Sequence, residues 1–340
     1  MFYTIARRFL CVRTFDEWSA QLVSRFFRRH LLRLSSPPAS VIAQQTIEVR
    51  TETPPQFARS GLQTFEVFSG QCYTDGESSY LTVDDSLIHT GTLASQLTTV
   101  WINSTTHARH PLSLSNVMSY AMQAALRRCG LFPLHAAGLI APVRERGLLI
   151  IGESGSGKST LALQLAAAGW RYLSDDSIAL TENADEDADA ADGMMTAHGL
   201  RRRFAVTDRS LAACALPRLS EAMQERMPSD ENKRYLDPAT AFPGQLASSC
   251  QPGVLLFPTI TNQPHSTVER LSRSAAMVHL ATFCPWACYD VSTSREHLRV
   301  LSGLTRQTTA YLLHAGRDLI EQAGRAASLV NALCEENNSH

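Results

Sequence analysis

The part of the chain whose residue types and spacing most directly indicate chemistry is a glycine-rich run: Gly152, Glu153, Ser154, Gly155, Ser156, Gly157, Lys158 and Ser159. It fits the pattern G-x-x-x-x-G-K-[ST] in full. Glycines let the backbone curl so that successive N–H groups point at phosphate oxygens, and a following helix adds the positive end of its dipole. We predict that this run and the adjacent Thr160 bind nucleotide phosphates. In that site Lys158 would reach the β- and γ-phosphates, and Ser159 would ligate Mg²⁺.

Two neighbouring aspartates follow this run. An apolar strand is predicted over 147–151, an Ala/Leu-rich helix over 158–168, and a further strand from residue 171. Asp175 and Asp176 close that strand, so one helix and one strand separate them from the glycine-rich run. One carboxylate could hold Mg²⁺ while the other accepts the proton of an attacking hydroxyl. The alternative is an ordinary acidic turn after a strand.

A histidine lies just before the glycine-rich run, in the strand-like segment LHAAGLI. A lone histidine on an apolar strand is more often a core residue with satisfied hydrogen bonds than a ligand. The residues alone therefore favour a packing role for His135, with a ligand role as the alternative.

The residues that precede the histidine and the glycine-rich run divide into two segments. Residues 1–40 hold seven arginines against Asp16 and Glu17, with apolar residues at roughly helical spacing, and end in the linker SSPPAS. We favour a helix that packs its apolar side on the protein surface. The alternatives are that this segment binds an anionic membrane, docks a partner or resembles an organellar transit sequence. Residues 41–125 alternate in short runs typical of antiparallel strands and close with a helix over 114–126.

The remaining residues, 126–336, are predicted to form the catalytic unit. A buried strand is expected over 254–260, with helices over about 269–282 and 315–335. The acidic run 182–192 is interpreted as a solvated loop between strands, with a metal role as the alternative.

Composition limits the class of protein. The 340 residues carry 31 Lys plus Arg against 32 Asp plus Glu, a net charge of -1, which disfavours a nucleic-acid partner. No apolar run reaches the roughly 18 residues that span a bilayer, so we expect no integral membrane segment and a cytoplasmic protein. The 8 cysteines are scattered, which favours neither a disulfide framework nor a zinc site.

Residues 134–180 resemble the C-terminal catalytic domain of bacterial HPr kinase/phosphorylase and its relatives. The shared pattern is a His-containing strand, a phosphate loop ending GKS, a short helix and an Asp-Asp pair; weaker similarity continues through NKRYLDP and LLFPTI. The resemblance implies an α/β fold with a P-loop kinase core of the phosphoenolpyruvate carboxykinase-like type, a mixed sheet with flanking helices. A smaller α+β domain would precede it. It also implies ATP- and Mg²⁺-dependent phosphorylation of a serine hydroxyl.

The resemblance also suggests roles for single residues. Asp176 would be the general base, Asp175 would lie on the metal side with Ser159, and His135 would lie near the transferred phosphoryl group or the acidic pair. The roles of the two aspartates, general base and metal ligand, could be exchanged. Contacts to phosphate or substrate would come from three further residues: Arg201, Lys233 and Arg234. Related catalytic domains assemble as oligomers, which allows a homo-oligomer here.

Three departures from the family pattern bear on the substrate. The metal-binding glutamate expected after the acidic pair is absent from HGLRRRF, Thr160 replaces the usual Glu, and residues 1–125 do not look like the family's N-terminal domain. HPr is therefore not a safe substrate. The architecture is more similar to HPr-kinase-related proteins found with ribosomally made peptides, including kinases of lasso peptide precursors, so a serine of a peptide or small protein is the favoured acceptor.

Four other classes compete with this interpretation. ABC-transporter ATPases share GESGSGKST, but the chain lacks an LSGGQ-like signature and a later strand ending Asp-Glu. Phosphoenolpyruvate carboxykinase itself is disfavoured by the short chain. A nucleotide-binding regulator without transfer activity, and a kinase of a small-molecule hydroxyl, stay open.

Overall fold

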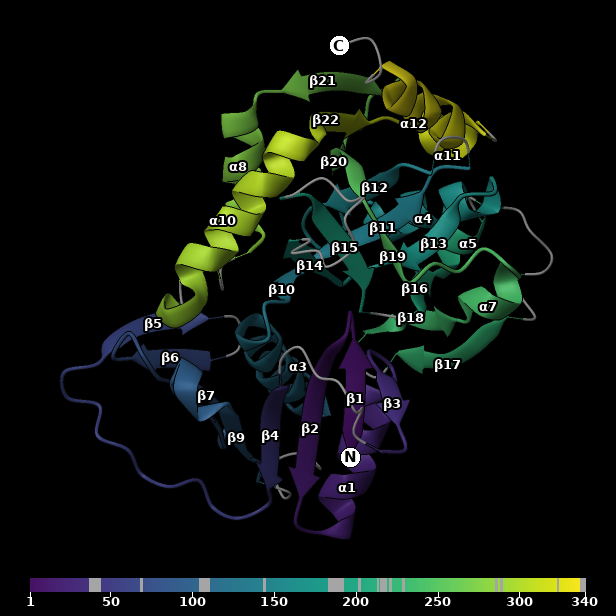
Figure 1. The fold of residues 1–340 in the computed structure, drawn as a ribbon. Helices are drawn as coiled ribbons and strands as arrows, with labels where there is room; N and C mark the ends of the chain where they lie inside the picture. Colours follow the sequence, from purple (N-terminus) through teal and green to yellow (C-terminus); the bar gives the residue numbers. More distant parts are fainter. Residues whose placement is uncertain are drawn as a thin grey trace. The chain divides into compact units, whose positions relative to one another are not determined.

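A computed structural model describes most of the chain, in the following ranges: 1–36, 44–67, 70–103, 111–142, 145–182, 193–200, 203–212, 214, 219, 222–227, 230–284, 287, 290–322 and 324–336. The chain forms two compact units. The first unit comprises Met1–Pro133 and Pro285–Leu298, and the second comprises Leu134–Cys284 and Arg299–His340. The architecture is mixed α/β, with several sheets and helices (Figure 1).

The first unit is built on one nine-stranded sheet in the order β3-β1-β2-β4-β9-β8-β7-β6-β5. Its strands are β1 (Phe2–Ile5), β2 (Arg8–Thr14), β3 (Leu32–Leu34), β4 (Gln44–Arg50), β5 (Gln63–Val67), β6 (Gly70–Thr74), β7 (Ser79–Val83), β8 (Ser86–Thr90) and β9 (Leu97–Trp101). The 3₁₀ turn η1 (Leu93–Ser95) precedes β9. Helix α3 (Pro111–Arg128) packs against β4, β8 and β9, which explains why alternate residues of β4 are buried.

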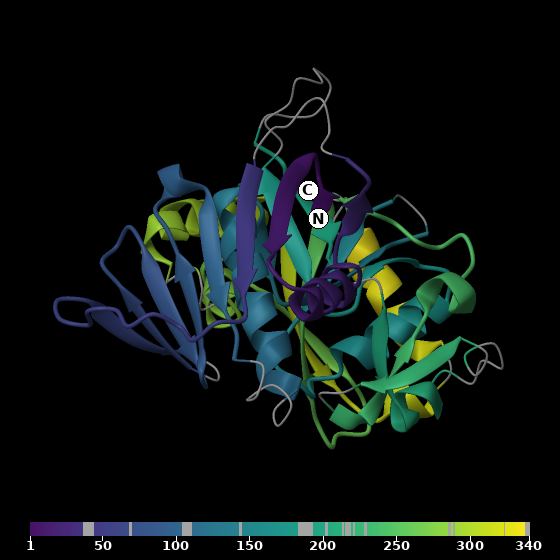
Figure 2. The ribbon, with the colours of Figure 1, turned by 90° about the horizontal axis from the view of Figure 1, so that it is seen from below.

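The first 36 residues differ from the helix expected for them. They contribute three strands to the nine-stranded sheet, and only α1 (Glu17–Phe27) is helical (Figure 2). The side chain of Asp16 accepts from the Ser19 N–H and starts that helix. In β2 four consecutive residues from Phe9 to Val12 are buried, as in a strand covered on both faces. Because β2 pairs in parallel with β4, residues 1–36 are part of the sheet rather than a separate segment.

The second unit is built on a six-stranded mixed sheet in the order β13-β11-β12-β20-β22-β21. Its strands are β11 (Ala136–Ile140), β12 (Gly147–Ile151), β13 (Arg171–Ser174), β20 (Pro252–Ile260), β21 (Thr267–Leu271) and β22 (Thr309–Ala315). The helices of this unit are α4 (Lys158–Ala167), α5 (Asp208–Ala212), α7 (Pro238–Ala241), α8 (Arg273–Thr282), α11 (Asp318–Glu321) and α12 (Arg325–Glu336). Helix α10 (Val291–Gln307) runs from the first unit into the second. Residues of α4 and α12 form one buried apolar cluster with the sheet.

Two smaller sheets complete the second unit. One contains β14 (Ile178–Glu182), β15 (Met195–Gly199) and β19 (Ser249–Cys250), and the other has the order β16 (Phe204–Thr207), β18 (Asp230–Leu236), β17 (Met223–Met227). The short strand β10 (Phe132–Leu134) lies where the chain passes between the units.

Several expected elements are confirmed, and two have different boundaries. The helix over 114–126 and the strand over 254–260 lie within α3 and β20. The helix expected over 269–282 begins only at Arg273, because Ser272 caps it by accepting from the Ala275 N–H. The segment 315–335 divides into α11 and α12. Arg201 and residues 183–192 of the acidic run lie outside the described residues.

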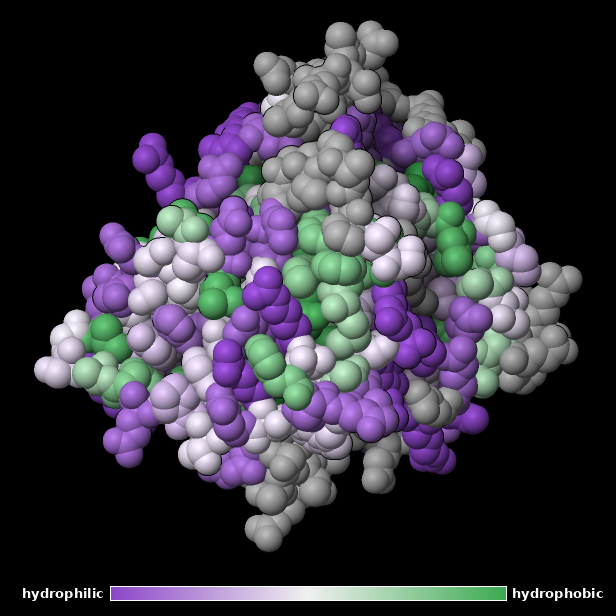
Figure 3. Space-filling view, turned by 60° about the horizontal axis from the view of Figure 1, so that its bottom comes forward, coloured by the Kyte–Doolittle hydropathy of each residue, from purple (hydrophilic) through white to green (hydrophobic). Residues whose placement is uncertain are grey.

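Hydrophobic side chains are scattered among hydrophilic ones on the face drawn in Figure 3. Within the described ranges, no helix is long and apolar enough to cross a membrane. The seven described cysteines are free thiols, and six of them are buried.

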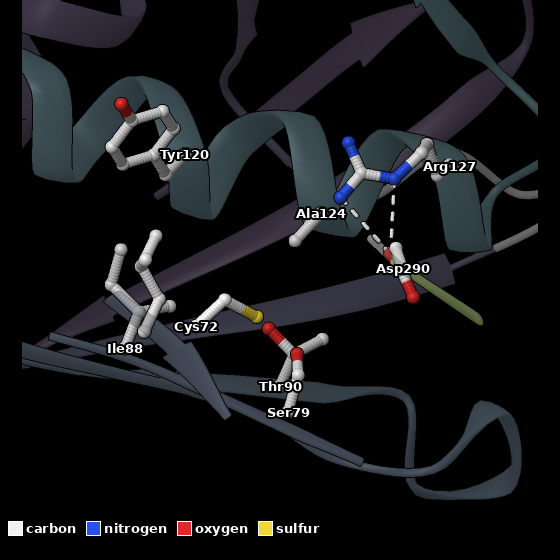
Figure 4. A pocket seen from close by; sticks show the side chains of 9 residues that line it. Cys72, Ser79, Ile88, Thr90, Tyr120, Ala124, Arg127 and Asp290 are labelled. Atoms are coloured by element: carbon white, nitrogen blue, oxygen red, sulfur yellow. Dashed lines mark hydrogen bonds and ion pairs between the residues drawn. The ribbon is translucent and has the colours of Figure 1, made fainter. Parts of the chain in front are cut away.

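A buried ion-pair cluster fixes the end of α3 in the first unit (Figure 4). The Asp290 carboxylate lies 3.0 Å from the guanidinium of Arg127 and 2.8 Å from that of Arg128, with all three side chains almost fully buried. Burial raises the pKa of Asp290, but Arg127, Arg128 and hydrogen bonds from Arg128 and Ser292 outweigh that effect and hold it well below its usual range. The cluster therefore stabilises the fold in the ionised form of Asp290.

Removing this carboxylate should be strongly destabilising. Asp290→Ala leaves two buried guanidinium groups facing each other, so we expect the free energy of unfolding to fall by about 3–5 kcal/mol. The matched control is Glu52→Ala, which removes an exposed partner of Arg50. This variant should change the free energy of unfolding by less than about 1 kcal/mol. Urea unfolding at pH 7 measures both. Equal losses in the two variants would contradict the prediction.

Candidate functional site

The directions of four strands bring the predicted residues to one edge of the six-stranded sheet. Strand β11 runs antiparallel to both β12 and β13, and β20 runs parallel to β12. Strands β12, β13 and β20 therefore end at the edge where β11 begins. His135 precedes β11, the glycine-rich loop (residues 152–159) follows β12, and Asp175 and Asp176 follow β13. The register agrees, because Ala136 lies opposite Ile151 and Gly138 opposite Ser174.

The glycine-rich loop has a conformation that its glycines make accessible. Gly155 and Gly157 have φ values of 86° and 97°, in the left-handed region that side chains disfavour. Gly157 is also the N-cap of α4, and its carbonyl accepts from the Leu161 N–H at 2.9 Å. At Gly152 a Cβ atom would lie 2.8 Å from the Ser156 Oγ, a contact too close to keep. The loop therefore turns directly from the end of β12 into α4, as predicted.

Lys158 is held inside this loop. Its Nζ donates to the carbonyls of Gly152 at 2.6 Å and Glu153 at 2.8 Å, and the residue is only 5% exposed. Burial lowers the pKa of Lys158, the nearby charge of Asp176 raises it, and Lys233 lowers it; the net shift is downward. The ammonium group thus lies in the electrostatic field of the acidic pair and of a second lysine.

The two aspartates have different environments. Asp175 is fully buried, and its Oδ2 accepts from the Ala205 N–H of β16 at 2.8 Å. The side chain of Asp176 is 35% exposed, and its Oδ1 lies 3.4 Å from Nδ1 of the 44% exposed His135. Asp175 is therefore fixed to a neighbouring strand, whereas Asp176 and His135 form a pair that solvent can reach.

A chain of hydroxyl groups connects α4 to the β16-α5 segment. The Thr160 Oγ1 lies 2.7 Å from the Ser210 Oγ, which lies 3.0 Å from the Thr207 Oγ1. Sequence reasoning missed Ser210 and Thr207. A threonine before a short helix signals an N-cap, but nothing in the sequence places that cap against α4.

The small sheet of β16, β18 and β17 carries one of the predicted basic residues to this region. Lys233 lies opposite Thr207 in the β16-β18 ladder, and its charge acts on Lys158. Arg234 is the next residue along β18, so its side chain lies on the other face of that sheet. The guanidinium of Arg203 lies over the ring of Tyr235, 5.7 Å from its centroid. Of the two described candidates Lys233 and Arg234, only Lys233 is thus linked to the loop.

The oxygen donors at this edge have the chemistry that Mg²⁺ prefers. They are the Ser159 hydroxyl in the first turn of α4 and the carboxylates of Asp175 and Asp176. Among the described residues no group of three or more His, Cys, Asp or Glu side chains could hold a metal. Mg²⁺ usually keeps several waters and takes one or two carboxylates together with substrate phosphates. A hydroxyl and two carboxylates therefore fit it, provided that phosphates complete the shell.

Comparisons with known proteins found similarity to solved structures but to no family or curated sequence. No protein-family model and no curated protein sequence matches this chain. The structure of the Hpr(Ser) kinase/phosphatase from Coxiella burnetii is similar over 60% of this chain and 98% of its own, with 12% identity and a TM-score of 0.31.

The different burial of the two aspartates predicts different effects on stability. Asp175→Ala leaves the buried Ala205 N–H without its acceptor, which should lower the free energy of unfolding by about 1–3 kcal/mol. Asp176→Ala removes a partly exposed side chain and should cost less than about 1 kcal/mol. Denaturant unfolding compares the two variants. A loss in Asp176→Ala as large as that in Asp175→Ala would show that the contact with Ala205 does not stabilise the fold.

Proposed function

We propose that the protein is a phosphotransferase that moves the γ-phosphoryl group of ATP, with Mg²⁺, to a serine hydroxyl of a peptide or small protein. One observation carries this proposal: a buried lysine in a glycine-rich loop, an aspartate pair and a histidine converge on a single sheet edge. A lysine and backbone N–H groups bind phosphates, and a carboxylate beside them can accept a proton.

The loop and Lys158 account for phosphate binding. The N–H groups at the start of α4 supply the positive end of a helix dipole, and Thr160 lies in the same turn. Lys158 exchanges its two carbonyl partners for phosphate oxygens or shares its protons among them. Mg²⁺, held by Ser159 and a carboxylate of the pair, would neutralise charge on the phosphates.

Asp176 is the general base in this proposal, since it is the accessible member of the acidic pair. It takes the proton of the serine hydroxyl as that oxygen attacks the γ-phosphorus and the bond to the leaving ADP oxygen breaks. His135 orients the Asp176 carboxylate through its Nδ1. Asp175, whose Oδ2 accepts from the Ala205 N–H, would be the carboxylate that holds Mg²⁺ together with Ser159.

Lys233 contributes a second positive charge near the transferring group. It lies opposite Thr207, whose hydroxyl contacts Ser210 and through it Thr160. A cation there stabilises charge on the equatorial phosphate oxygens as the transfer proceeds. The proposed contact of Arg234 with phosphate has no such support, because adjacent strand residues face opposite sides.

A nucleotide-binding regulator without transfer activity is the second candidate. The observation that favours it is that Lys158 already donates to its own loop carbonyls, a state that stabilises the loop without catalysis. A regulator would bind nucleotide as tightly as a kinase, so only turnover separates the two.

Turnover should depend on Asp176. The protein is incubated with Mg-ATP and candidate acceptors, starting with any small peptide precursor encoded beside its gene, and intact mass is measured. We expect a phosphate-sized gain on a serine, and a roughly 10²- to 10⁴-fold slower rate for Asp176→Asn with nucleotide binding retained. Asp208→Asn, at the exposed start of α5, is the matched control and should keep its rate. Near wild-type turnover in Asp176→Asn would refute its role as base, and ATP binding without a mass gain on any acceptor would favour the regulator.

Nucleotide affinity should depend on Lys158. Replacing it by Ala removes hydrogen bonds from a charged donor to phosphate, which predicts a roughly tenfold to hundredfold weaker affinity for Mg-ATP. Titration calorimetry measures this, with the exposed Arg209→Ala as control. Undiminished affinity in Lys158→Ala would refute the assignment of this loop to phosphate binding.

A further inference from the structure

A small pocket in the first unit lies apart from the candidate functional site. It is enclosed by helix α3 and by strands β6, β7 and β8 (Figure 4). On α3 it is lined by Tyr120, Ala124 and Arg127, which are spaced about one helical turn apart and so share one face of the helix. Ala124 carries only a methyl group between the two long side chains. This short side chain leaves the gap that forms the pocket.

The sheet side of the pocket carries two hydroxyl groups. Ser79 of β7 lies opposite Thr90 of β8, and both side chains reach the pocket beside the thiol of Cys72 (Figure 4). Among the nine residues that line the pocket, hydrogen bonds and ion pairs join only Arg127 and Asp290. The two hydroxyls therefore do not spend their donor capacity on the other lining residues. Burial raises the pKa of Cys72 to about 11, so its thiol adds no charge at neutral pH.

The ion-pair cluster at the edge of the pocket holds more positive than negative charge. The guanidinium groups of Arg127 and Arg128 share one carboxylate, that of Asp290, and all three side chains are almost fully buried. Burial keeps two neighbouring groups neutral, because it raises the pKa of Tyr120 to about 12 and lowers that of His297 to about 3. The carbonyl end of α3 offsets only part of the excess. Since buried charge without a counter-charge is costly, the pocket favours an anion.

The two ends of the pocket differ in polarity. Ile88 and Tyr120 lie at one end, and Arg127 and Asp290 lie at the other (Figure 4). Leu81, the cross-strand partner of Ile88, adds a second aliphatic side chain. The free space is about 330 Å³ even when the mouth that opens to solvent is counted, which is small for a ligand pocket. A matching ligand is therefore short, with a negative head group and an apolar tail.

We propose that this pocket binds a short-chain carboxylic acid in its ionised form. The carboxylate of the ligand accepts from the guanidinium of Arg127 and from the hydroxyls of Ser79 and Thr90, as carboxylates commonly do. Its alkyl tail packs between Ile88 and Tyr120. The inference does not rest on the proposed phosphoryl transfer, because every residue involved belongs to the first unit. Since the ligand binds only the folded pocket, it stabilises the fold.

The experiment follows thermal unfolding of the full chain with three probes at one ionic strength. Sodium propionate should raise the Tm as its concentration increases. Propionamide has nearly the same size without the charge, and sodium chloride has the charge without the tail, so neither should raise it. The dissociation constant of propionate is then measured by titration calorimetry and compared among variants.

Three variants locate the binding site. Thr90→Val keeps the shape of the side chain but removes a hydrogen bond to a charged group, so it should weaken propionate about tenfold. Ala124→Val fills the gap in the face of α3 and should abolish the rise in Tm. The matched control is Thr82→Val, the same substitution on the opposite face of β7, which should keep the wild-type affinity. Because Thr90→Val preserves packing, it tests the site even if Ala124→Val fails to fold.

The opposite outcomes overturn the inference. An equal rise in Tm with chloride would mean that the pocket takes any small anion and does not select a carboxylate with a tail. An unchanged Tm with all three probes would mean that the pocket holds only water. Wild-type affinity in both Thr90→Val and Ala124→Val would place propionate elsewhere on the chain. None of these outcomes bears on the proposed function, which is tested with variants of the second unit.

Discussion

The candidate site depends on one strand that runs against its neighbours. Strand β11 lies between β12 and β13, antiparallel to both, so its beginning meets the ends of the other two. If β11 ran parallel to them, His135 would lie at the far end of a five-residue strand, about 17 Å from Asp176. Small side chains between β11 and α4 allow the helix to pack closely on this strand. Ala137 belongs to the same buried cluster as Ala162 and Ala166 of α4, and methyl groups at these positions let the helix lie close to the sheet.

The charges at the sheet edge explain why a divalent cation belongs to the proposed chemistry. Lys158 lies in the field of one further lysine, Lys233, and of three carboxylates, those of Asp176, Asp175 and Glu153. A triphosphate adds several negative charges to this set, in a region where Lys158 and Asp175 are already removed from water. Uncompensated charge is costly under such conditions. A cation that enters with the phosphates offsets it, and the exposed side of Asp176 is where that ion and the acceptor can approach.

The sequence alone predicted those parts of the site whose structure is determined by residues close together in the sequence. The glycine-rich loop is such a part, because its conformation needs glycine at Gly155 and Gly157, and a strand and a helix next to it. The contact of Asp175 with Ala205 could not be predicted, since it joins residues 30 positions apart through a backbone N–H that any residue supplies. The same holds for Ser210. The N-terminal strands were mistaken for a helix because short apolar runs such as β2 fit either period.

A chain of polar contacts links the carboxylate of Asp175 to the first turn of α4. Asp175 bonds to the backbone of β16, that strand leads into the hydroxyl chain of Thr207 and Ser210, and Ser210 contacts Thr160 in the first turn of α4. Burying Asp175 is costly, and the N–H of Ala205 together with the nearby charge of Lys158 offsets that cost. Displacing β16 would break the buried hydrogen bond from the Ala205 N–H to Asp175. It would also break the contacts of the Thr207 and Ser210 hydroxyls. Each break costs about 1–3 kcal/mol when a buried group is left unsatisfied. These contacts therefore hold Asp175 at a fixed position relative to the start of α4, which is the condition that the proposed in-line transfer between a nucleotide and a hydroxyl would impose on the site.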